Sequence, residues 1–196
     1  PMGTLAPHRP AWIAALAITL VTLGVLLAMG RPPICTCGTV ELWYGNINSS
    51  GNSQHLSDWY TPSHVIHGML FYGLGWLLFR KWSLGSEHAG RWAFALAVFL
   101  EAAWEVIENT PFVIDRYRAV TVNWGYSGDS VINSMADIGW MSLGFWLAMR
   151  LPVKVTVALA VAAEIITALV VKDNLTLNVL MLVWPLESVR VWQGAG

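Results

Sequence analysis

Several long apolar runs constrain this chain more than any other feature. The first covers residues 11–30 and carries no charge, which gives it the roughly 20 residues that an α-helix needs to cross a bilayer. Similar runs predict helices at about 62–79, 92–109, 129–149 and 153–171. Of the 196 residues, 56% are hydrophobic and 12% are charged, whereas soluble domains carry about 25% charged residues. The sequence therefore predicts an all-α fold, a polytopic transmembrane helical bundle with five spans in a single integral membrane domain, residues 2–196.

The C-terminal segment, residues 175–192, leaves two alternatives open. Its apolar part covers only about ten residues before Pro185, which is short for a span. With a kink at Pro185 the segment becomes a sixth span, and otherwise it forms an interfacial helix. Residues 31–60 form a polar outer loop that is longer than usual connections, and such length is typical of a functional element such as a lid.

The basic residues indicate an orientation. With the N-terminus inside, the inner side holds six Lys and Arg residues and the outer side four or five. The inner set is Arg9, Arg80, Lys81, Arg91, Arg150 and Lys154. The positive-inside rule then predicts a multi-pass protein with a cytoplasmic N-terminus. The net charge of −1 offers no basic surface, so no nucleic-acid partner is expected.

The two cysteines, Cys35 and Cys37, form a C-x-C motif just after the first apolar run. In a periplasmic loop the compartment allows a disulfide. Two cysteines alone make no zinc site, so we expect a disulfide or free thiols in preference to a metal role.

Three carboxylates interrupt the third predicted helix. Glu101, Glu105 and Glu108 fall within about 60° of one another on one helical face. An acidic residue at the centre of a membrane helix costs roughly 2.5–3.5 kcal/mol on translocon scales, and less near the ends. Such residues normally face a protein interior, a polar cavity or a metal. The sequence therefore predicts that other helices present polar groups to this face.

The two neighbouring predicted helices carry polar groups at matching depth. His64 and His67 lie in the first two turns of the second helix, and Asp129, Asn133 and Asp137 are spaced i, i+4, i+8 on the fourth. Because consecutive antiparallel helices are neighbours, we expect His64 or His67, Glu105, and Asp129 or Asn133 to share one site near the outer membrane face.

This mixture of histidines and carboxylates is the donor set of zinc, iron and manganese sites, with zinc expected first. The predicted metal ligands are His64, His67, Glu105 and Asp129. The predicted catalytic residues are Glu101, as general base, and Asp137. The supporting residues are Glu108, Asn133 and Ser134.

Other interpretations stay open at this point. A buried hydrogen-bonded network of Glu101, Glu105 and Asp137 with Asn133 and Ser134 would be purely structural. Glu108 and Asp129 also suit solvated helix ends, where Ser127 or Asp129 could cap the fourth helix and Thr61 the second.

Three stretches carry a resemblance to a known family. W-Y-T-P-S-H-V-I-H-G (59–68), E-A-A-W-E-V-I-E-N-T-P (101–111) and Y-S-G-D-S-V-I-N-S-x-x-D (126–137) resemble a bacterial inner-membrane family of unknown function, known mainly from alphaproteobacteria. More distantly, the order His, Glu, then Asp-x-x-x-Asn is similar to that of VanZ-like membrane proteins. That resemblance implies places for His64 or His67, Glu101 or Glu105, and Asp129 with Asn133.

The function expected from these observations is a metal-dependent membrane hydrolase or transferase. It would act on a lipid or lipid-linked head group at the periplasmic face, with membrane lipids as its partners. A proton- or ion-coupled transporter would use the same carboxylates as a relay. A non-enzymatic accessory protein would instead present the loop at residues 31–60 to a partner.

Overall fold

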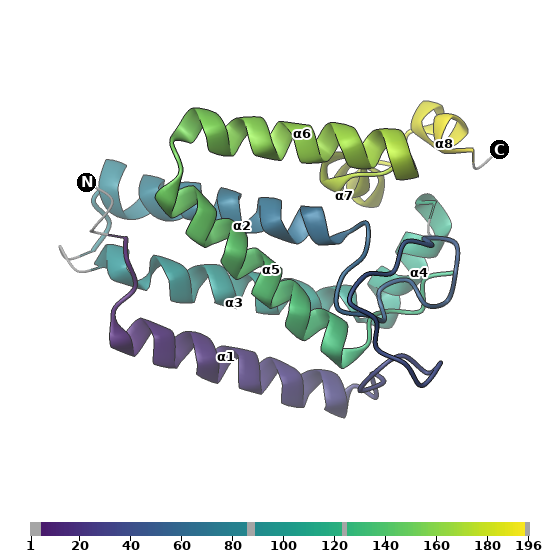
Figure 1. Ribbon diagram of the computed structural model, residues 1–196, viewed down its shortest axis with the longest axis horizontal. Helices are drawn as coiled ribbons and strands as arrows, with labels where there is room; N and C mark the ends of the chain where they lie inside the picture. Colours follow the sequence, from purple (N-terminus) through teal and green to yellow (C-terminus); the bar gives the residue numbers. More distant parts are fainter. Residues whose placement is uncertain (1–4, 86–88, 123–124, 195–196) are drawn as a thin grey trace.

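The computed structural model describes residues 5–85, 89–122 and 125–194, which are all-helical and contain no β-strand (Figure 1). The predicted domain also includes residues 2–4 and 195–196, which lie outside these ranges. The long helices are α1 (Arg9–Ala28), α2 (Thr61–Trp76), α3 (Ala93–Glu108), α5 (Val131–Arg150) and α6 (Val153–Val171). The short ones are α4 (Pro111–Val120), α7 (Leu175–Val183) and α8 (Glu187–Gln193). A π-helical turn, Leu77–Lys81, extends α2, and a 3-10 turn, Ala89–Trp92, leads into α3.

The five long helices form a bundle with two different ends. Helices α1, α2, α3 and α6 run side by side, and α5 crosses the bundle obliquely in contact with α2 and α3 (Figure 1). One end holds the start of α1 and the short turn between α5 and α6. The other end holds residues 31–60 together with α4, α7 and α8. The all-α class expected from the sequence is confirmed.

Helix α4 lies between the predicted helices at about 92–109 and 129–149, where no helix was predicted. Thr110 is its N-cap, with its side chain accepting a hydrogen bond from Val113 N, and Pro111 occupies the first turn. A proline after a polar cap residue begins a helix as readily as it ends one. Thr110 and Pro111 therefore begin a helix that the apolar runs did not predict.

Residues 175–192 form neither a continuous sixth span nor one interfacial helix. Helix α7 has 9 residues and α8 has 7, so at about 1.5 Å per residue neither exceeds roughly 14 Å. The break falls at residues 184–186, where Pro185 has no N–H group to continue the hydrogen-bond ladder.

Two predicted caps are also corrected. The N-cap of α5 is Ser130, whose hydroxyl accepts from Asn133 N at 3.2 Å, and neither Ser127 nor Asp129 fills that role. The N-cap of α2 is Tyr60, with Thr61 the first helical residue. Each predicted N-cap differs from the observed one by one or more residues, because neighbouring residues before each helix also have side chains that can cap it.

Two helices, α1 and α6, are long and apolar enough by length and composition to cross a membrane. In α6 only Thr167 and Val171 are buried, and large apolar side chains such as Leu169, which is 75% exposed, cover its outer face. Helices α2 and α3 have 16 residues each. Length and hydropathy among the described residues thus support two spans, fewer than the five expected.

Small residues let α2 and α5 approach closely. A Cβ atom added to Gly68 would lie 1.9 Å from the carbonyl oxygen of Met141, and one added to Gly144 would lie 1.9 Å from that of Val65. Such close backbone approach needs residues without side chains at the crossing point. The contact fixes the polar residues of α2 against those of α5.

The loop at residues 31–60 covers one end of the bundle. Its residues 52–55 are buried, and Ser130 N donates to Ser53 O while Asn133 Nδ2 donates to His55 O. Cys35 and Cys37 are joined by a disulfide, one of the two states expected for them. The loop is therefore anchored to the start of α5.

Candidate functional site

The two histidines of α2 converge on one carboxylate of α3. His64 Nδ1 lies 2.6 Å from Glu101 Oε1, and His67 Nδ1 lies 2.9 Å from Glu101 Oε2. Glu101 is fully buried. Both imidazoles are therefore oriented by the same carboxylate, which leaves the two Nε2 atoms free to meet other groups.

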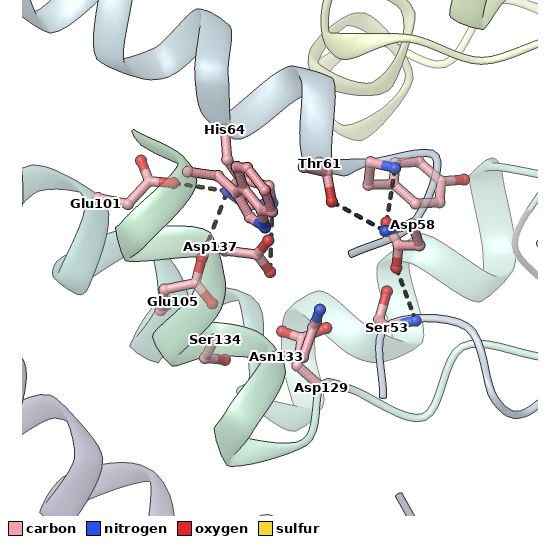
Figure 2. Close-up of polar contacts among 12 residues, drawn as sticks. Ser53, Asp58, Thr61, His64, Glu101, Glu105, Asp129, Asn133, Ser134 and Asp137 are labelled. Carbon is pink, nitrogen blue, oxygen red and sulfur yellow. Dashed lines mark hydrogen bonds and ion pairs between the residues drawn. The ribbon is translucent and has the colours of Figure 1, made fainter. Parts of the chain in front are cut away.

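His64 also faces carboxylates from α3 and α5. Its Nδ1 lies 3.6 Å from Glu105 Oε1, and its Nε2 lies 3.7 Å from Asp137 Oδ2. Figure 2 shows the ring between Glu101 and Glu105 on one side and Asp137 on the other. Residues from three helices therefore meet at His64, and Asp137 of α5 lies beside its ring where Asp129 or Asn133 was expected.

Glu105 lies at the centre of this site without a hydrogen bond. Its side chain is fully buried, and among the described residues neither carboxylate oxygen has a hydrogen-bond partner. A buried charged carboxylate left in this way costs several kcal/mol unless it is protonated or gains a compensating charge or ligand.

Asp129 precedes α5 and is held from two directions. Asn109 Nδ2 donates to its Oδ2 at 2.6 Å, and the Tyr126 hydroxyl donates to its Oδ1 at 2.9 Å. The backbone N–H of Asp129 in turn donates to Asn109 Oδ1 at 2.8 Å. Burial raises the pKa of Asp129 to about 6, although the hydrogen bonds from Tyr126 and Asn109 favour its charged form. The carboxylate therefore has a fixed orientation.

Two of the predicted supporting residues, Asn133 and Ser134, hold neighbouring segments in place, and the third, Glu108, lines the cavity. Asn133 Nδ2 donates to His55 O in the covering loop. Ser134 Oγ lies 3.5 Å from Asn109 Nδ2. Both residues are buried, and they position the loop and Asn109.

A cavity of about 110 Å³ opens beside these groups. Polar side chains that the sequence singled out line part of it, namely His64, His67, Glu108, Asp129, Asn133 and Asp137. The remaining wall includes aromatic and apolar side chains from other elements, among them Tyr60, Trp104, Tyr117, Tyr126, Leu175 and Val179. Glu101 lies behind the histidines and does not line this cavity.

Three overlapping groups of side chains around the cavity could hold a metal ion. In each group the potential ligand atoms lie within 4.8 Å of one another. The groups are His64, His67 and Glu101; His64, Glu105 and Asp137; and Glu105, Glu108 and Asp129. All four predicted metal ligands therefore appear in at least one group.

Several residues of the site were not predicted. Asn109 follows Glu105 by four residues and so lies on the same helical face, a signal that the sequence did contain. Tyr117 had no such signal, because α4 was not predicted. Its hydroxyl donates to Asn178 Oδ1 at 2.7 Å and thereby joins α4 to α7 at the cavity wall.

The chain matches the family described as "Protein of unknown function (DUF2585)" over residues 26–195. A UPF0314 protein of Novosphingobium aromaticivorans is 55% identical over 192 residues, covering 98% of this chain and 96% of the relative. A UPF0314 protein of Rhizobium etli is 52% identical over 188 residues, covering 95% and 93%. A UPF0314 protein of Paracoccus denitrificans is 53% identical over 186 residues, also covering 95% and 93%. No solved structure matches.

Proposed function

This chain belongs to the DUF2585 family, and from its site we propose that it is a metal-dependent integral membrane hydrolase or transferase. Its substrate would be a lipid or lipid-linked head group at the periplasmic face of the inner membrane. The observation that carries the proposal is the arrangement of His64, whose Nδ1 is bound to Glu101 while its Nε2 faces Asp137 beside a cavity. Histidine ligands of metals usually have this arrangement, with the second nitrogen bound to a carboxylate.

Five spans are part of the proposal. The π-helical turn extends α2 to residue 81, and the 3-10 turn extends α3 back to residue 89. At 1.5 Å per residue both segments then reach about 30 Å, the thickness of the hydrocarbon core. The exposed apolar faces of α1 and α6 also suit lipid better than water.

The distribution of charge supports the orientation. Arg9, Arg80, Arg91 and Arg150 belong to the end of the bundle that holds the start of α1. The cavity lies toward the opposite end, under the loop at residues 31–60. With the more basic end in the cytoplasm, the site faces the periplasm.

We assign the metal to His64, Glu105 and Asp137, which come from three helices held together by packing. A divalent cation there would lower the pKa of a bound water and polarise an ester or phosphoester bond of the head group. His67 also lines the cavity and has its Nδ1 fixed by Glu101, so we assign it the role of proton acceptor. Glu101 itself orients the two histidines, which changes the general-base role expected from the sequence.

The cavity wall supports a lipid-linked substrate. Leu175 and Val179 of α7 line the same cavity as Glu108, Asp129 and Asp137, so apolar and polar surfaces meet in one space. A head group could reach the carboxylates while its apolar portion stays toward α7.

Metal analysis of the purified full-length protein in detergent tests this function. The wild type should bind a divalent metal, and His64→Ala should lose most of it. His8→Ala is the matched control, since His8 caps α1 at the other end of the bundle and should retain full binding.

The same preparations are then incubated with total bacterial inner-membrane lipids, and the lipids are compared by mass spectrometry. Wild type should release or transfer a head group, and His67→Ala should retain the metal but lose turnover. A protein without bound metal that leaves every lipid unchanged would overturn the proposal. Proton flux into proteoliposomes that depends on Glu101, with no lipid consumed, would favour a transporter instead.

A further inference from the structure

We propose that the carboxylate cluster beside the cavity binds two divalent cations bridged by the carboxylate of Glu105, an inference that rests on the metal-dependent function above. Glu105 belongs to two of the potential metal-binding groups, and it is the carboxylate that they share. On one side it stands with His64 and Asp137, and on the other with Glu108 and Asp129. A carboxylate shared in this way is the usual bridge of two-metal sites, where the ions lie about 3.5–4 Å apart.

The unsatisfied oxygens of Glu105 support the bridge independently. Both oxygens are buried and lack a hydrogen-bond partner among the described residues, whereas the carboxylates of Glu101 and Asp129 are hydrogen-bonded through both oxygens. Two lone pairs on each oxygen are thus free for metal coordination. One cation would coordinate only one oxygen of Glu105, whereas two cations would coordinate both.

The two positions differ in their donors. The first has one imidazole and two carboxylates, a set that suits zinc, iron or manganese. The second has carboxylates only, a set that suits magnesium or manganese. Asn109 and Tyr126 orient Asp129 in the second position, as outer-shell residues commonly do for ligands. Manganese fits both positions and is therefore the probe of choice.

Two cations would also define the class of substrate. They would turn an acidic cavity into one that accepts an anion, and they would stabilise the attacking and the leaving oxygen of an in-line displacement. The substrate of the proposed enzyme is then a lipid whose head group contains a phosphodiester or pyrophosphate. Water attacks phosphorus, the P–O bond to the leaving group breaks, and His67 takes the proton of the attacking water.

The test is the number of Mn²⁺ ions bound by the full-length protein after equilibrium dialysis, measured together with its electron paramagnetic resonance spectrum. Wild type should bind two ions with the spectrum of a coupled pair. Asp129→Asn and Asp137→Asn should each bind one ion with the spectrum of isolated Mn²⁺. Asp115→Asn is the matched control, because that carboxylate is largely exposed and pairs only with Arg118 among the described residues. It should bind two.

The possible results separate the two proposals. One ion in wild type, or two retained in Glu105→Gln, overturns the bridged pair and leaves the metal-dependent function standing. No ion in wild type overturns both. The number of Mn²⁺ ions bound by the wild type and its spectrum are enough to test the bridged pair. A variant that fails to fold therefore does not prevent a conclusion.

Discussion

Alanine at Gly144 should separate α2 from α5 and disrupt the site from a distance. The added Cβ would lie 1.9 Å from Val65 O, whereas ordinary contacts begin at 3.4 Å. The helices must therefore move apart by about 1.5 Å at this point, since a backbone carbonyl cannot rotate away within a helix. Overpacking of this kind costs about 1–3 kcal/mol, and we expect the upper part of that range.

The loss of stability should be measured by thermal unfolding in detergent, followed through the fluorescence of the 12 tryptophans. At roughly 2–4 °C for each kcal/mol in a chain of this size, Gly144→Ala should lower Tm by several degrees. Val65 adjoins His64, so the same variant should lengthen the His64–Asp137 approach and weaken metal binding.

Gly139→Ala is the matched control on the same helix. Nothing lies within 4 Å of its added Cβ, and the better helix propensity of alanine should leave Tm unchanged or raise it slightly. Equal Tm values for Gly144→Ala and Gly139→Ala would refute the close packing of α2 on α5.

Three further predictions concern residues around the site. Glu101→Gln should weaken metal binding about 10–100-fold, because the amide cannot accept from both histidines, and unchanged affinity in a chelator competition would contradict its orienting role. Arg31→Ala should destabilise the protein by about 2 kcal/mol, since the guanidinium donates to Asp129 O and Ser127 O at 3.0 and 2.8 Å; a Tm equal to that of the exposed-site variant Arg190→Ala would count against it. Burial raises the pKa of Asp173 to about 6, so the folded state keeps a proton that the unfolded chain releases near pH 4, and stability should fall by roughly 3 kcal/mol as the pH rises from about 4 through 6. Asp173→Asn should flatten that part of the Tm profile, and a parallel profile would show that another group is responsible.

Short-range signals in the sequence were sufficient for the long helices. Apolar runs placed α1, α2, α3, α5 and α6 because each of these helices is set by its own hydrophobic length. The prolines at helix boundaries were ambiguous signals, and the boundaries predicted there were wrong. No helix was predicted at Pro111, where α4 begins, and residues 175–192 were expected to form one span or one interfacial helix, whereas Pro185 separates two helices.

The sequence also indicated which residues meet. Three carboxylates on one face of an apolar helix require polar partners, and matching depth pointed to the histidines of α2 and to the polar residues 129, 133 and 137, among which the structure places His64 and Asp137 in contact. That inference worked because helical periodicity and short connections limit which side chains can face one another.

The roles of those residues depended on the tertiary structure. Periodicity cannot show that Glu101 lies behind both histidines, or that Glu105 remains without a hydrogen bond between two groups of donors. These features follow from how far apart the backbones lie, and Gly68 and Gly144 set that distance between α2 and α5. Helical spacing along one chain segment determines which side chains share a face, but only the packing of several segments determines the ångström-scale distances on which hydrogen bonding and metal coordination depend.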